Sequence, residues 1–177
     1  MDLKGIALNR DEIEKLINEE KLIEGFIDLK TQLTPNGIDL TIAAISEFDA
    51  AGALDFSNKE RALPAGKEMV PQKISPQDKF GWWDLKKGAY KIKTNETVNL
   101  PGDIIALAFS RTSLLRMGAF TQHGVWDAGF KGKGEFILEV ENNFGIRIKQ
   151  NARVAQLVFL MINGTAHEYK GIYQGLK

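Results

Sequence analysis

Short runs of β-forming residues dominate the chain after its first 25 positions, and Gly, Pro and Asn separate one run from the next. Runs of this length and composition predict strands. The last run, residues 154–162, is apolar on both faces, as in a strand at the centre of a sheet, whereas residues 89–94 alternate with lysine, as in a strand with one wet face. Many short strands with turn-rich joints favour a sandwich, jelly roll or barrel over alternating β and α units. The predicted strands span residues 38–45, 89–94, 104–109, 135–141, 144–149 and 154–162.

One short amphipathic helix is predicted ahead of the strands. Asn9 and Glu12 have the spacing of a capping box, in which the two side chains accept hydrogen bonds from backbone N–H groups at the helix start. Apolar residues at positions 13, 16 and 17 then share one helical face. The helix is expected to end near Gly25.

The chain of 177 residues has the size of one domain, and its sequence contains no repeat that suggests a second. Residues 49–84 hold three prolines and many charged residues, so this segment is expected to form long loops, with or without a hairpin. The predicted organisation is a single domain over residues 1–177, with a helical segment at 1–25 and a loop-rich insertion at 49–84.

Composition excludes several classes of protein. Hydrophobic residues make up 44% of the chain and charged residues 26%, which is typical of a folded globular domain. The 23 basic and 23 acidic residues balance, so we expect no nucleic-acid-binding surface. The sequence has no cysteine, which excludes disulfides, thiolate catalysis and cysteine-ligated zinc, and its two histidines are too few for a metal site of their own. No apolar run reaches about 18 residues and the N-terminus is acidic, so a cytoplasmic protein without a membrane partner is expected.

The densest polar segment, residues 110–116, follows a predicted apolar strand and could open a short helix. The guanidinium group of Arg111 and the neighbouring hydroxyl groups are donors that suit phosphate oxygens. The alternative interpretation is an ordinary helix N-cap with solvated arginines, because Ser and Thr are common caps.

Residues 123–132 form a second candidate, in which three glycines and Asp127 interrupt bulky residues. Glycine lets a backbone approach a ligand closely. A tight hairpin here could offer N–H and C=O groups to a nucleobase edge, with Phe130 packed flat on a sugar. The alternative is a plain hairpin turn with Trp126 and Phe130 in the core.

Two further polar residues stand out against their surroundings. Gln156 is the one polar side chain within an otherwise apolar predicted strand, and a buried amide needs hydrogen-bond partners, either structural groups or a ligand's phosphate. Asp39 begins a predicted strand directly after the turn at residues 35–37, which by itself is a weak signal.

Taken in order, these segments resemble the motifs of the dUTPase and dCTP deaminase superfamily, and most closely those of its archaeal dUTPase branch. The resemblance implies an all-β, jelly-roll-like distorted β-barrel that forms a homotrimer, with nucleotide sites built between subunits and Mg²⁺ bound mainly through the triphosphate. The matching segments are Asn-Gly-Ile-Asp-Leu at 36–40, Arg-Thr-Ser-Leu at 111–114, Gly-Val-Trp-Asp-Ala-Gly-Phe-Lys-Gly at 124–132 and Ala-Arg-Val-Ala-Gln-Leu at 152–157.

The same resemblance implies hydrolysis of dUTP to dUMP and pyrophosphate by attack of a water on the α-phosphorus. Asp127 would activate the water, and Asp39 would support a metal-bound water. The phosphates would contact Arg111, Thr112, Ser113 and Gln156, and the base and sugar would contact Gly124, Val125, Trp126 and Phe130.

The chain also departs from the family's pattern. Phe130 stands where the family commonly has Tyr, and the glycine-rich tail that closes the site in ordinary dUTPases is absent. Either the C-terminal segment supplies part of that closure, through Tyr169, Tyr173 and Gln174, or the phosphates stay more exposed.

Two other functions remain open on sequence alone. Glu139 resembles the proton-shuttling glutamate of dCTP deaminases, which would make the protein a deaminase or a bifunctional enzyme. However, the spacing from Asp127 is longer than in deaminases, and Glu139 shares a predicted strand face with Glu135 and Glu141, as in a solvated acidic face. The third possibility is a nucleotide-binding or assembly protein without turnover.

Overall fold

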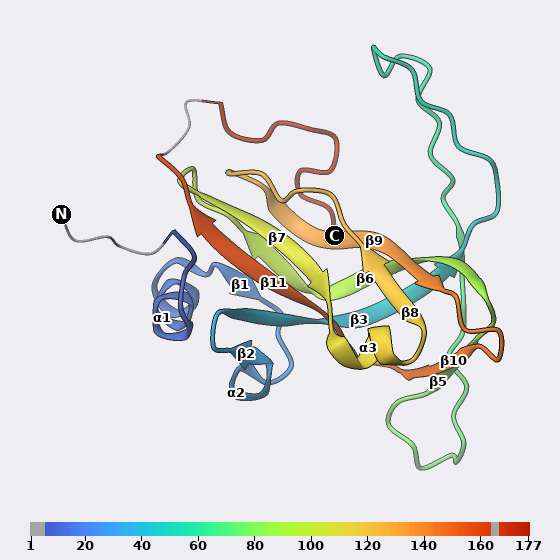
Figure 1. Ribbon diagram of the computed structural model, residues 1–177. Coiled ribbons are helices and arrows are strands. Elements are labelled where there is room, and N and C mark those ends of the chain that lie inside the picture. The colour runs from blue at the N-terminus through green and yellow to red at the C-terminus, as the bar shows by residue number, and fades with distance from the viewer. Residues whose placement is uncertain (1–5, 164–166) are drawn as a thin grey trace.

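A computed structural model describes residues 6–163 and 167–177. Its main feature is an antiparallel sheet that curls into a nearly closed barrel, with the strand order β7-β11-β3-β6-β9-β8 (Figure 1). These strands are β3 (Gly37–Glu47), β6 (Gly88–Asn99), β7 (Ile104–Ser110), β8 (Ala119–Gln122), β9 (Lys131–Val140) and β11 (Arg153–Met161).

Short elements complete the described structure. Three two-residue strands pair at the margins of the barrel sheet, and two four-residue strands form a separate ribbon. The marginal strands are β1 (Ile23–Glu24), β2 (Leu33–Thr34) and β4 (Lys67–Glu68), the ribbon is β5 (Trp82–Leu85) with β10 (Ile146–Lys149), and the helices are α1 (Arg10–Glu20), α2 (Leu29–Gln32) and α3 (Thr112–Arg116).

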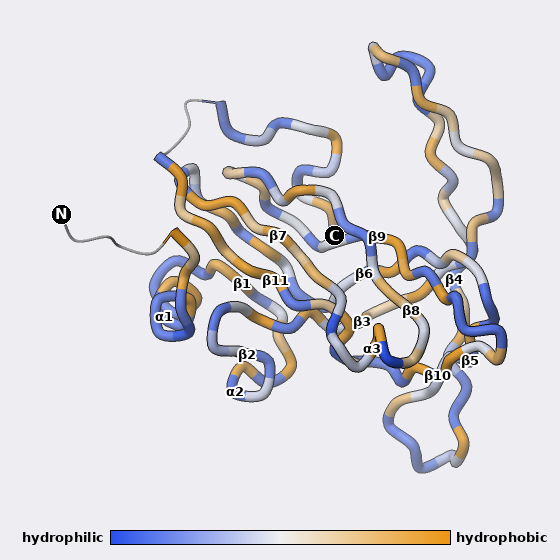
Figure 2. Tube along the Cα trace, in the orientation of Figure 1, coloured by the Kyte–Doolittle hydropathy of each residue, from blue (hydrophilic) through white to orange (hydrophobic). Residues whose placement is uncertain are grey.

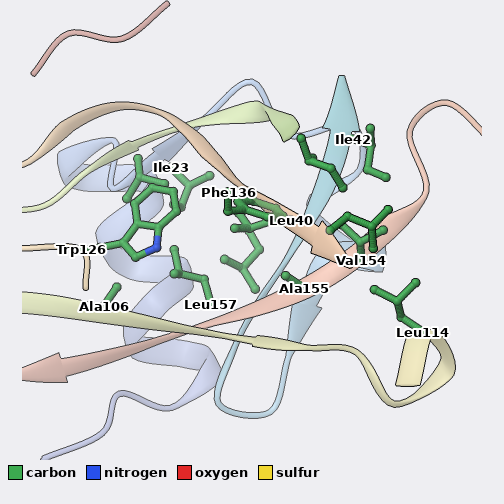
Figure 3. Close-up of a cluster of buried hydrophobic side chains, with 14 of the residues drawn as sticks. Ile23, Leu40, Ile42, Ala106, Leu114, Trp126, Phe136, Val154, Ala155 and Leu157 are labelled. Carbon is green, nitrogen blue, oxygen red and sulfur yellow. The ribbon is translucent and has the colours of Figure 1, made fainter. Parts of the chain in front are cut away.

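Each of the six predicted strands is present, and the prediction of an all-β barrel is confirmed. The prediction that the last strand is central is also confirmed, because β11 lies between β7 and β3. This strand contributes Val154, Ala155 and Leu157 to the apolar core shown in Figure 3.

The predicted capping box of α1 is confirmed. The N–H of Glu12 donates to Asn9 Oδ1 at 3.0 Å, and the N–H of Asn9 donates to Glu12 Oε2 at 2.9 Å. The predicted end near Gly25 is wrong, because α1 ends at Glu20 and Lys21 adopts a left-handed conformation with φ 56°. The chain then pairs with β6 through β1, and that pairing ends the helical conformation early.

The barrel closes between its edge strands by few contacts. The hydroxyl oxygen of Ser110, at the end of β7, accepts a hydrogen bond from the N–H of Thr121 in β8 at 2.7 Å. Farther along β7, Ala106 and Trp126 exchange two backbone hydrogen bonds of 2.9 and 3.0 Å. Residues 122–125 lie between these two contacts, so hydrogen bonds to β7 fix the chain both before and after this segment.

The segment at 49–84 leaves the barrel as two long excursions (Figure 1). Within the first, Ala53 and Ala62 exchange two backbone hydrogen bonds of 2.9 Å, which makes a narrow arm. The ring of Phe56 near the end of this arm is fully exposed. In the part of the chain that the structure describes, no helix is long and apolar enough to cross a membrane.

Candidate active site

An arginine–aspartate cluster joins three strands at one end of the barrel. Arg111 Nε lies 3.0 Å from Asp39 Oδ2, and Arg153 Nη1 lies 3.2 Å from the same oxygen. The register brings these residues together, because Gln156 of β11 pairs with Asp39 of β3 on one side and with Phe109 of β7 on the other. Three segments far apart in the sequence therefore converge on one carboxylate.

The carboxylate of Asp39 is almost fully enclosed, with 3% of its side chain exposed. Burial raises the pKa of Asp39 above its ordinary value, and the positive charges of Arg111 and Arg153 act in the opposite direction. The two arginine side chains are about one third exposed, and a guanidinium group has five N–H donors, more than these ion pairs use. The cluster can thus offer fixed positive charge to an anion.

The remaining predicted phosphate ligands lie around this cluster. Thr112 and Ser113 are exposed in the first turn of α3, directly after Arg111. The alternative of an ordinary Ser or Thr cap is wrong for the helix that the structure describes, since its N-cap residue is Arg111 and makes no side-chain capping bond. Gln156 is half-buried and donates to Thr34 Oγ1 at 2.9 Å, which gives its amide a structural partner.

A cavity of about 560 Å³ lies beside the loop that precedes β9. Its wall includes residues 123–127, Phe130 and residues 133–137, and the C-terminal segment adds Tyr169 and Tyr173. Asp127 is exposed on this wall, where a bound molecule could reach its carboxylate.

Aromatic packing fixes the shape of the loop. Phe130 meets Trp126 edge to face at 5.5 Å and meets Tyr169 at the same centroid distance. Trp126 and Phe130 are 7% and 9% exposed, so both rings lie in the core, as the alternative interpretation of this segment expected. Both residues also line the cavity. Gly134 allows this packing, because a Cβ there would lie 2.4 Å from the Trp126 ring.

The loop also presents free main-chain groups. Among the described residues, the backbone N–H and C=O groups of residues 123–125 have no hydrogen-bond partner within the protein. Unpaired donors and acceptors in a row, beside a cavity, can bind a planar ligand edge.

The C-terminal segment folds back on this loop (Figure 1). Gln174 accepts from the N–H of Lys131 at 2.9 Å and donates to the C=O of Gly129 at 2.9 Å. The N–H of Tyr169 donates to the C=O of Ala128 at 2.9 Å. Tyr169, Tyr173 and Gln174 therefore all lie against the cavity or the backbone that supports it.

Within one chain, the two groups of predicted site residues are separate. Of the residues that the structure describes, those that line the cavity include Asp127 but neither Arg111 nor Asp39. The loop pairs with β7 at Ala106, whereas Arg111 directly follows Ser110, the last residue of β7. Ala106 and Ser110 are four residues apart, which is about 13 Å along a strand. Glu139, the alternative proton shuttle, lies outside the described cavity wall.

Two site residues were not predicted from the sequence. Arg153 completes the arginine–aspartate cluster and lies within the quoted segment at 152–157, three residues before Gln156. His123 lines the cavity directly before the loop glycine Gly124. In the described ranges, no group of three His, Asp or Glu side chains gathers as a metal site would require.

The chain matches the family described as dCTP deaminase-like over residues 7–162. It is similar to curated archaeal proteins. The Archaeoglobus fulgidus protein named "Probable deoxyuridine 5'-triphosphate nucleotidohydrolase" is 40% identical over 169 residues, which are 96% of each chain. A Methanosarcina acetivorans protein of the same name is 42% identical over 94% of this chain and 95% of its own length.

A solved structure of another protein shares the fold. The crystal structure of 2'-deoxycytidine 5'-triphosphate deaminase from Agrobacterium tumefaciens superposes with a TM-score of 0.65 at 19% identity. The match covers 88% of this chain and 48% of that one. At this identity the likeness concerns the fold alone.

Proposed function

This chain belongs to the dCTP deaminase-like family, and we propose that within this family it hydrolyses dUTP to dUMP and pyrophosphate. The observation that carries the proposal is the cavity that brings Asp127 together with the free main-chain groups of residues 123–125. Similarity to proteins named as dUTP nucleotidohydrolases, over nearly the whole chain, supports the same substrate.

Uracil binds in this proposal against the main chain of the loop at 123–130. An edge of alternating acceptors and donors, O2, N3–H and O4, suits free backbone N–H and C=O groups. Gly124 and Val125 supply these groups, because the main chain of Trp126 is already paired with Ala106. Trp126 supports the base pocket through its ring, and Phe130 packs against the deoxyribose. A site built on such hydrogen bonds rejects a base whose polarity is reversed, because buried polar groups are then left unpaired.

Asp127 is the proposed catalytic residue. Its carboxylate accepts a proton from a water while the water oxygen forms a bond to the α-phosphorus. The bond from the α-phosphorus to the bridging oxygen breaks, and pyrophosphate leaves. Reactions of this kind depend on positioning and on neutralising the phosphate charge.

Arg111 is the proposed phosphate ligand, with Thr112, Ser113 and Gln156 beside it. The ion pair with Asp39 holds the Arg111 guanidinium at its Nε, and Nη1 donates to the C=O of Arg153 at 3.3 Å, which leaves Nη2 for ligand oxygens. Arg153, held by the same carboxylate, adds positive charge to this surface.

A homotrimer would bring the two halves of this site together. In one chain the arginine–aspartate cluster and Asp127 lie at different places along β7, so a complete site needs Asp127 from one copy and Arg111 from another. The outer faces of β7 and β11 support such an assembly, because Leu107 lies opposite Val158 and Ile105 opposite Leu160, all partly exposed. Both strands are largely hydrophobic along their length (Figure 2). Phe109, 58% exposed, continues this apolar row toward Arg111.

Magnesium is the proposed cofactor, carried by the substrate. The described residues offer no cluster of three acidic or histidine ligands, and the Oδ2 atom of Asp39 is engaged by two arginines. This donor set suits an ion held mainly by triphosphate oxygens and water, with Asp39 contacting it through a water. Bound in this way, Mg²⁺ supplies charge neutralisation on the phosphates.

The direct test incubates the pure protein with Mg²⁺ and either dUTP or dCTP. Release of pyrophosphate and dUMP from dUTP is expected, without ammonia from dCTP. Ammonia from dCTP would support the deaminase alternative, and no product from either nucleotide would reject both enzymatic functions.

Complementation tests whether the site is shared between copies. Arg111→Ala and Asp127→Asn are each expected to be inactive. In a homo-oligomer co-expressed from equal amounts of the two variants, about a quarter of shared sites receive both intact residues, so about a quarter of the activity should return. If the mixture stays inactive while wild-type controls assemble, the site is not shared.

A further inference from the structure

His123 contains an unusual buried nitrogen. Across residues 6–163 and 167–177, His123 Nδ1 is the one buried side-chain nitrogen or oxygen atom that has no hydrogen-bond partner. The imidazole ring lines the cavity and packs against Phe136, with ring centroids 4.1 Å apart. The buried Nδ1 therefore belongs to a residue of the cavity wall. Proteins rarely leave a buried polar atom unpaired, and a ligand is one group that can pair it.

The imidazole is neutral at ordinary pH, so it has a fixed hydrogen-bonding polarity. Burial lowers the pKa of His123 to about 4. In a neutral imidazole one nitrogen donates and the other accepts, and the partner of one nitrogen sets the behaviour of the other. Here Nε2 lies 2.8 Å from the hydroxyl oxygen of Thr121.

The hydroxyl groups behind His123 form a short chain. Ser110 Oγ accepts from the N–H of Thr121, and two acceptors lie within reach of its own proton, Thr121 Oγ1 at 3.1 Å and the Thr121 C=O at 3.2 Å. When Ser110 donates its proton to Thr121 Oγ1, the Thr121 hydroxyl is free to donate to His123 Nε2. The proton of the imidazole then resides on Nδ1.

We propose that His123 is a specificity-determining residue, whose Nδ1–H donates to the O4 carbonyl of uracil and thereby disfavours cytosine. Uracil and cytosine differ at this position, where one has an acceptor and the other a donor. The main-chain groups of residues 123–125 remain for the rest of the base edge. This inference rests on the proposed function, because it assumes that the cavity takes a pyrimidine nucleotide.

The first test reads the tautomer directly. The chain has two histidines, so the His167→Ala variant leaves His123 as the only imidazole in ¹⁵N NMR spectra. At pH 7 the proton is expected on Nδ1, and dUMP should shift the Nδ1 resonance whereas dCMP at equal concentration should not. A proton on Nε2, or a Nδ1 resonance that dUMP leaves unchanged, would overturn the inference.

The second test reads specificity. His123→Ala should raise the KM for dUTP about 10- to 100-fold, with a smaller effect on kcat, and should weaken the preference for dUTP over dCTP as a competing ligand by a similar factor. Thr121→Val should weaken the preference with His123 still present, and Thr121→Ser should restore it. A purely structural role would lower the affinity for both nucleotides equally, and that result contradicts the proposal.

The two tests separate this inference from the proposed function. If the wild-type protein releases no pyrophosphate from dUTP, the proposed function fails, while the NMR titration with dUMP and dCMP still decides the role of His123. If dUTP is hydrolysed and the substitutions leave the dUTP preference unchanged, only the inference about His123 fails.

Discussion

Arg111 and Asp39 form an ion pair in which the guanidinium Nε lies 3.0 Å from the carboxylate Oδ2. The pair joins the end of β7 to β3, and Arg153 of β11 binds the same oxygen. A nearly buried carboxylate thereby holds two arginines whose side chains are partly exposed. Because both arginines are positioned by Asp39, substitution of Asp39 is the most direct test of the cluster.

Asp39→Ala is expected to raise the KM for dUTP at least about 10-fold and to lower the free energy of unfolding by about 2 kcal/mol, since two partly buried cations lose their partner. Steady-state kinetics and urea unfolding measure the two effects. Asp84→Ala is the matched control, because Asp84 pairs with Arg147 on the exposed face of the β5–β10 ribbon and its loss should cost no more than about 0.5 kcal/mol. Equal behaviour of the two variants would show that the cluster has no special role.

Asp127→Asn should lower kcat about 100-fold or more while nucleotide affinity changes little, because the amide keeps the shape of the side chain but cannot accept the proton. Calorimetric binding of dUMP and pre-steady-state turnover of dUTP separate binding from chemistry. Asp103→Asn, at an exposed position outside the described cavity wall, is the control. Retained turnover in the Asp127 variant would remove that residue from the mechanism.

Gln174→Ala should raise the KM for dUTP by about 3- to 10-fold, because it removes two hydrogen bonds, to Lys131 and Gly129, of about 1 kcal/mol each. The C-terminal segment would then cover the cavity less of the time. Gln77→Ala, in the loop between β4 and β5, should leave the KM unchanged. Should the KM stay unaltered in the Gln174 variant, the segment does not help to close the site.

Glu96 should make stability depend on pH. Its side chain is fully buried, and its carboxylate accepts hydrogen bonds from Gln32 and from the N–H and hydroxyl of Thr41 at 2.6 to 2.9 Å. Burial raises the pKa of Glu96 above the ordinary 4.5, although these hydrogen bonds oppose the shift. Between the ordinary and the raised pKa the native state binds more protons than the unfolded chain, so this group's contribution to stability falls as pH rises.

Glu96→Gln removes the ionisation and should reduce that fall. Urea midpoints measured at intervals from pH 4 to pH 8 provide the comparison. Glu135→Gln, on the exposed side of β9, should follow the wild-type profile. A Glu96→Gln profile that runs parallel to wild type would mean that Glu96 has the same pKa in both states.

The strands were predictable because their signal is local. The two-faced apolar pattern of residues 154–162 indicated a central strand, and β11 lies between two neighbours. The start of α1 was equally local, because Asn9 and Glu12 cap the same turn. Its end was not, since Lys21 stops the helix where β1 begins to pair with β6, more than 70 residues away.

The arginine–aspartate cluster of the candidate site was predictable in part. Motif resemblance singled out Asp39 and Arg111, and the structure pairs them. Arg153 was missed because its contact depends on the register of β11 against β3, which shifts by a bulge between Arg153 and Ala155. His123 was missed because an unpartnered ring nitrogen is a property of the packed protein, and neither composition nor spacing reveals it.

If the apolar row along β7 and β11 joins copies of the chain, enzyme activity depends on protein concentration. Sites completed by neighbouring copies appear only as fast as chains find one another, so activity would rise more steeply than the number of molecules made. On dilution such an oligomer would dissociate and lose activity, although the separated chains could remain folded.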